Sequence, residues 1–152
     1  MSRSQSRRRA LVRWLPAVAW MAVIFLLSSQ SGLAVTEDVA VERPIRGFAH
    51  LAAFGLLGGL VLYALSANAR PTIAKAVLAM AITTLYAVSD ELHQSIVPDR
   101  TGRAQDVVID ALGALVGLTV AWLVLRRSTG PPGPARSGSG PSGGGATDPG
   151  GS

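Results

Sequence analysis

The 152-residue sequence contains no cysteine. This absence excludes disulfide bonds, metal sites built on thiolates and thiol nucleophiles. Charged residues are also scarce, at 15% of the chain, and aromatic residues make up only 5%. The net charge of +5 comes without aromatic residues interleaved among the basic ones and without an RNA-binding motif. No nucleic-acid partner is therefore expected.

The familiar catalytic motifs are missing as well. The sequence has no HExxH zinc motif, no Walker A loop, no GxGxxG loop and no GxSxG turn. A metal site can be drawn from His50, Glu91, His93 and Asp106, but their spacing matches no established zinc pattern. The sequence therefore predicts no bound metal and no cofactor, and it predicts that His93 is a surface or loop residue.

Long apolar runs dominate what the sequence does contain. Each run is close to the roughly 20 residues that an α-helix needs to cross the hydrocarbon core of a bilayer. The sequence therefore predicts an all-α fold, an integral membrane bundle of four transmembrane helices whose main partner is the lipid bilayer. The predicted spans lie at about residues 11–29, 45–65, 72–89 and 106–125.

Lysine and arginine are concentrated before the first run, in the 66–75 turn and after the last run. By the positive-inside rule, both termini lie in the cytoplasm of a multi-pass cell-membrane protein. Residues 6–11 also resemble a twin-arginine export signal, so cleavage stays open, although an uncleaved anchor is the simpler interpretation. The expected organisation is a basic cytoplasmic N-terminus at 1–10, a membrane domain at 11–127 and a disordered Gly/Pro/Ser-rich tail at 128–152.

The stretch 89–106 places ionisable residues between two apolar runs and is expected to face outward. Such side chains near hydrocarbon are costly unless they are paired, hydrated or used, so they mark candidate functional residues. Helical spacing adds polar residues of the second and fourth runs, which lie at the same end of the bundle. The candidate ligand-binding residues are Arg46, His50, Asp90, Glu91, Gln94, Arg100, Asp106 and Asp110.

Two arrangements of these side chains stay open. In a closed lattice, arginines of the connecting turn bridge to Glu91 or Asp106 and simply tie three helices together. In a water-accessible pocket, the same arginines hold a phosphate or carboxylate of a ligand. No catalytic residue can be assigned. The candidates are His50, because imidazole changes its charge near neutral pH, and Glu91, because a carboxylate can act as a base.

A GxxxG motif, Gly55 to Gly59, lies on roughly the opposite face of the second run from His50. In the fourth run, Gly113 and Gly117 share a stripe with the acidic residues. Small residues at this spacing let another helix approach closely. The contact can form inside the bundle or between copies of the chain, so a homo-oligomer through these faces stays open.

The segments 90–102 and 106–117 resemble the VanZ-like family of bacterial membrane proteins, as do residues 46–54 with their basic residue, histidine and aromatic residue. The resemblance covers residues 11–127. The chain departs from the pattern at Arg46, where Lys is usual, at Phe54, where Tyr is common, and at Asp110, where Asn is frequent.

This resemblance implies a role at the bacterial cell envelope. The founding member of the family is associated with low-level resistance to the glycopeptide teicoplanin. The expected function is binding of an envelope lipid or a glycopeptide-related ligand in an outward-facing polar pocket, and whether any reaction is catalysed stays open. The alternative is a membrane-embedded acid/base enzyme acting on a phosphate- or acyl-bearing envelope lipid.

Overall fold

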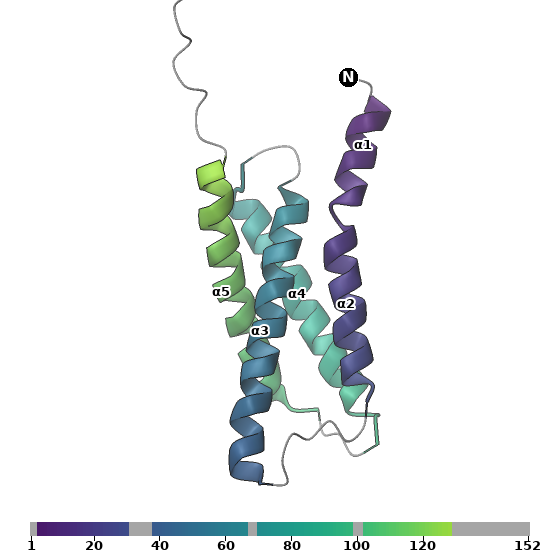
Figure 1. Ribbon diagram of the computed structural model, residues 1–152, viewed down its shortest axis with the longest axis vertical. Coiled ribbons are helices and arrows are strands. Elements are labelled where there is room, and N and C mark those ends of the chain that lie inside the picture. The colour runs from purple at the N-terminus through teal and green to yellow at the C-terminus, as the bar shows by residue number, and fades with distance from the viewer. Residues whose placement is uncertain (1–2, 31–37, 67–69, 99–101, 129–152) are drawn as a thin grey trace, which may run out of the picture.

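A computed structural model describes residues 3–30, 38–66, 70–98 and 102–128 of the chain (Figure 1). Within these ranges the chain is helical apart from the short connections, which confirms the predicted all-α fold. The helices are α1 (Arg3–Val12), α2 (Leu15–Ser28), α3 (Val39–Leu65), α4 (Ile73–Gln94) and α5 (Ala104–Ser128).

Among the described residues, four helical stretches are long and apolar enough to cross a membrane. Large apolar side chains such as Phe48, Leu85 and Val116 are exposed on the outer surface of these helices. Contact of so much apolar surface with water would be unfavourable, whereas contact with lipid is not. The predicted bundle of four transmembrane helices is thus confirmed, and the chain is a multi-pass membrane protein. The stretches are Ala10–Ser28, Ala40–Leu65, Ile73–Gln94 and Ala104–Arg127.

Two of the helices extend well beyond the apolar runs that predicted them. Helix α3 begins at Val39 rather than near residue 45, because the Asp38 carboxylate caps it by accepting a hydrogen bond from the Ala40 N–H at 2.9 Å. Helix α4 continues to Gln94 rather than ending near residue 89. Hydropathy marks the membrane stretch, whereas capping and backbone hydrogen bonds decide where a helix ends.

Helix α3 lies at the centre of the bundle and packs along α5 (Figure 1). The two backbones come so close that a side chain at Gly113 would collide with the carbonyl of Leu51, and one at Gly117 with the carbonyl of Gly55. The GxxxG face of α3 is therefore occupied inside the bundle. His50 also reaches α5, although it lies on another face of α3, because the close approach lets side chains bridge around the contact.

Helix α2 is joined to the others by polar contacts as well as by the apolar core. The indole N–H of Trp20 donates to the carbonyl of Ala53 at 2.9 Å, and the hydroxyl of Tyr86 donates to the carbonyl of Met21 at 2.6 Å. The buried core beside these contacts includes Phe54, Leu57, Val61, Leu62 and Leu118.

The helix ends are divided between the two ends of the bundle. The start of α1 and the end of α5 lie at one end, together with the end of α3 and the start of α4 (Figure 1). The end of α4, the start of α5 and the first turns of α3 lie at the other end. This second end carries most of the polar residues singled out in the sequence.

Candidate functional site

The deepest polar contact at this end joins α3 to α5. Nδ1 of His50 lies 3.1 Å from Oδ1 of Asp110, as a hydrogen bond and an ion pair when the imidazole is protonated. The Asp110 side chain is completely buried and that of His50 is 14% exposed. Asp110 can lie this deep because Gly113, one turn further on, brings α5 against α3.

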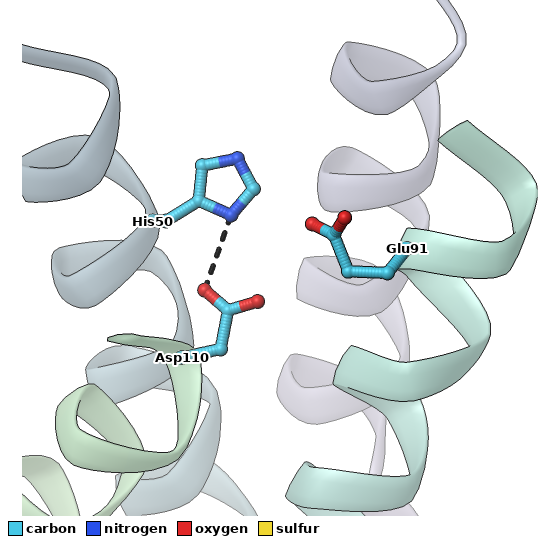
Figure 2. A group of neighbouring side chains, drawn as sticks. All are labelled: His50, Glu91 and Asp110. Carbon is cyan, nitrogen blue, oxygen red and sulfur yellow. Dashed lines mark hydrogen bonds and ion pairs between the residues drawn. The ribbon is translucent and has the colours of Figure 1, made fainter. Parts of the chain in front are cut away.

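Glu91 faces this pair from the last turns of α4 and is only 6% exposed (Figure 2). Its Oε2 accepts a hydrogen bond from the backbone N–H of Arg103 at 2.7 Å. Gly102 makes this possible, because any side chain there would collide with the carbonyl of Glu91. One nitrogen or oxygen atom from each of His50, Glu91 and Asp110 lies within 4.8 Å of the others. We call these three residues the triad.

A second group of side chains forms a hydrogen-bond chain across α3, α4 and α2. Nη2 of Arg46 donates to Oε1 of Gln94 at 2.7 Å, and Nε2 of Gln94 donates to Oδ2 of Asp90 at 2.8 Å. The hydroxyl of Ser28 donates to the same Asp90 oxygen at 2.9 Å. We call the triad together with Arg46, Asp90, Gln94 and Ser28 the polar cluster.

The hydrogen bonding of this cluster is incomplete. A carboxylate oxygen of Asp90, of Glu91 and of Asp110 is buried without a hydrogen-bond partner, and so is Nε of Arg46. Buried polar groups in proteins normally have partners, so each such atom calls for an explanation. Three unpartnered acceptors against one donor give the cluster spare capacity to accept hydrogen bonds or to hold positive charge.

Most of the ligand-binding candidates proposed from the sequence lie in this cluster. Asp106 lies one turn before Asp110 but is partly exposed. Arg103, one of the two arginines of the connecting turn, contacts Glu91 through its backbone N–H and not through the side-chain bridge of the closed-lattice arrangement, and its side chain is exposed. Arg100 lies outside the described residues. The six candidates brought together are Arg46, His50, Asp90, Glu91, Gln94 and Asp110.

Two features of the site were not predicted from the sequence. Ser28 was missed, and its signal is modest: it begins the polar end of an apolar run. His93 was expected at the surface or in a loop, but it is partly buried on α4, because the helix continues past residue 89. Its Nε2 lies 3.0 Å from the hydroxyl of Ser29, and its ring stacks on Phe25 at 4.6 Å between centroids. His93 therefore lies against α2, away from the triad.

Comparison with known proteins gives one finding. A model of the VanZ/LLP1 family matches residues 13–125, a range that contains the whole polar cluster. No curated protein and no solved structure matches the chain.

Proposed function

This chain belongs to the VanZ/LLP1 family, and on that premise we propose that it is a cell-envelope protein that binds an amphiphilic ligand at its polar cluster. The ligand is the polar part of an envelope lipid or of a glycopeptide-related molecule. Its apolar part lies along the exposed apolar faces of the helices. The chain acts by binding and not by catalysis.

The observation that carries this proposal is the set of buried carboxylate oxygens without partners on Asp90, Glu91 and Asp110. A buried polar group left without a partner costs about 1–3 kcal/mol. A ligand that offers amine or hydroxyl hydrogens would recover part of this cost at each oxygen. A site that serves only to hold helices together has no need of such spare acceptors.

The excess of acidic over basic groups also restricts which ligands can bind. Acidic groups outnumber Arg46 and His50 in and beside the cluster, so an anionic phosphate placed directly against it would be repelled. The sequence-based expectation of a phosphate held by arginines is therefore less favourable than a headgroup that carries hydrogen-bond donors. Sugars, amino sugars and aminated peptides meet that requirement.

We further propose that the cluster faces outward and that both termini are cytoplasmic. The basic residues before α2, in the turn after α3 and at the end of α5 support this orientation, because basic residues accumulate on the cytoplasmic side. An outward-facing cluster would meet envelope lipids and external glycopeptides without their crossing the membrane.

A second candidate, an acid/base enzyme, is supported by the His50–Asp110 contact. A buried carboxylate at 3.1 Å from the imidazole nitrogen can fix the orientation of the ring and stabilise its charged form. Glu91 lies across from this pair, where it could exchange a proton with a bound lipid (Figure 2). The binding function and the enzyme function use the same residues, and they differ in whether the protein converts the ligand into a product.

The test compares the variants Glu91→Gln and Asp90→Asn with the wild-type chain at matched membrane levels. Both changes keep the shape of the side chain and remove its charge, and Glu42→Gln in the first turn of α3 is the matched control. Teicoplanin sensitivity and envelope-lipid composition are measured for each strain and for a deletion strain.

Binding predicts that the two site variants become as sensitive to teicoplanin as the deletion strain, with an unchanged lipid profile. A lipid profile that changes with the wild-type chain but not with Glu91→Gln would support the enzyme instead. Site variants that behave like Glu42→Gln in both measurements, or a wild-type chain that differs from the deletion strain in neither, would overturn the proposal.

A further inference from the structure

We propose that His50, Glu91 and Asp110 bind one divalent transition-metal cation, of the Zn²⁺ or Mn²⁺ type. One imidazole nitrogen and two carboxylate oxygens form a donor set that such ions accept. The three ligands come from α3, α4 and α5, at the end of the bundle where these helices converge (Figure 2).

The distances within the triad are close to those of a metal site. Ligand atoms about 2.0–2.2 Å from one ion lie roughly 3.0–3.6 Å from each other. The 3.1 Å separation between Nδ1 of His50 and Oδ1 of Asp110 falls within this range. All three candidate ligand atoms lie within 4.8 Å of one another, so Glu91 needs a shift of about 1 Å, which a side-chain rotation provides.

Independent support comes from the unpartnered oxygens of the two acids. Glu91 and Asp110 are 6% and 0% exposed, and Oε1 of Glu91 and Oδ2 of Asp110 are buried without hydrogen bonds. Figure 2 shows the Glu91 side chain extending from α4 into the gap toward His50 and Asp110, with the second oxygen of Asp110 on the side of that gap that faces α4. Two buried carboxylates with ligand atoms within 4.8 Å of each other are unfavourable unless positive charge lies between them, and a divalent cation supplies it.

The surroundings also suit a metal site. The backbone N–H of Arg103 holds Oε2 of Glu91 at 2.7 Å, which orients the carboxylate as outer hydrogen bonds orient metal ligands. The guanidinium of Arg46, the nearest basic group on α3, donates to Gln94 instead of pairing with the triad. Arg46 therefore does not neutralise the two carboxylates of the triad by a direct contact.

This inference revises the expectation of no metal that followed from spacing alone. His50 and Asp110 are 60 residues apart and lie on different helices, so no short motif could reveal them. The four residues first considered are also not the right set, since His93 contacts α2 and Asp110 takes the place of Asp106. The inference rests on the proposed function in one respect, that the polar cluster is a binding site; with the cation bound to Glu91 and Asp110, the unpartnered oxygen of Asp90 is the acceptor left for the ligand.

The experiment uses the full chain purified in detergent and stripped of metal. Titration with ZnCl₂ followed by calorimetry, and with MnCl₂ followed by electron paramagnetic resonance, should each show one saturable site. Asp110→Asn and Glu91→Gln should weaken that binding by about tenfold or more. Glu42→Gln should bind as the wild type does.

A second readout covers variants that fold poorly. Zn²⁺ should raise the melting temperature of the wild-type chain, whereas Mg²⁺, which prefers an all-oxygen octahedral site, should have much less effect. Absence of saturable Zn²⁺ and Mn²⁺ binding in the wild-type chain, or equal binding by wild type and Asp110→Asn, would overturn the metal site. Metal binding without any teicoplanin or lipid effect would leave this site standing and overturn the proposed function alone.

Discussion

At the scale of single residues, Gln94 connects most of the polar cluster. Its amide oxygen accepts from Arg46 on α3 and its amide nitrogen donates to Asp90 on its own helix, while the side chain is fully buried. An amide is suited to this position because it is a donor and an acceptor at once. A carboxylate could accept from Arg46 but would repel Asp90.

Gln94→Leu is predicted to lower the free energy of unfolding in detergent by about 2–3 kcal/mol. The change removes hydrogen bonds to two charged groups and leaves both without that partner. Thermal or denaturant unfolding of the purified chain measures the effect. Gln105→Leu is the control, since Gln105 is exposed at the start of α5 and should change stability little. Equal stability of the two variants would show that the hydrogen bonds of the Gln94 amide do not stabilise the fold.

At the same scale, the sequence predicted which residues would be polar and buried but not how they pair. Glu91, Gln94 and Asp110 stand out because they interrupt or adjoin apolar runs. That Asp90 pairs with Ser28 instead of an arginine depends on how α2 and α4 pack, and hydropathy holds no information on this. The closed-lattice alternative assumed a side-chain contact from Arg100 or Arg103; Arg103 contacts Glu91 through its backbone N–H, and Arg100 lies outside the described residues.

At the scale of the helices, the contact between α3 and α5 decides how much polar chemistry the bundle can enclose. Because the two backbones touch near Gly113 and Gly117, side chains one turn away, such as Asp110, lie within hydrogen-bond distance of the other helix. The glycine spacing predicted close approach correctly. It did not predict that the partner was α5, since any helix with a small-residue face would have satisfied the pattern.

Gly117→Ala is predicted to destabilise the bundle by about 1–3 kcal/mol, because the added methyl group collides with the carbonyl of Gly55. In an exposed helix, the same change would be stabilising by roughly 1 kcal/mol. Gly47→Ala in α3 is the matched control, since its nearest neighbour, Cδ1 of Ile109, lies at an ordinary 3.7 Å. The two variants should therefore move the melting temperature in opposite directions. A shift in the same direction for both would mean that the close approach is not maintained.

At the scale of the whole molecule, the missing cysteine makes the proposed orientation easy to test. Ile96→Cys places a thiol on an exposed position after α4, and Gln5→Cys places one on an exposed position of α1, at the opposite end. A membrane-impermeant maleimide should label Ile96→Cys in intact cells and Gln5→Cys only after permeabilisation. The cysteine-free wild type gives the background. The reverse pattern would place the cluster on the cytoplasmic side and remove the basis for an external ligand.

The fold as a whole was predictable because four apolar runs of near-membrane length admit few arrangements other than a helical bundle. The helix ends were less predictable, and they decide the site: α4 extends through Gln94, so Asp90, Glu91 and Gln94 project from a rigid helix and not from a loop. Capping by Asp38 extends α3 in the same way. Contacts between distant helices, such as Glu91 opposite His50 and Asp110, depend on tertiary packing and leave no pattern in a single sequence.

The pairing of His50 with Asp110 also has a consequence for membrane insertion, because the two residues are synthesised at different times. His50 enters the bilayer with the second span, but its carboxylate partner is synthesised 60 residues later, in the last span. Until α5 is inserted, the imidazole of His50 lies beside lipid or translocon without Asp110, and an unsatisfied polar side chain in that environment is costly. A chain that stops before α5 keeps this cost permanently, so membrane proteases should clear it faster than the complete chain in a pulse-chase measurement. The last helix to be synthesised is thus the one that supplies the carboxylate partner of His50.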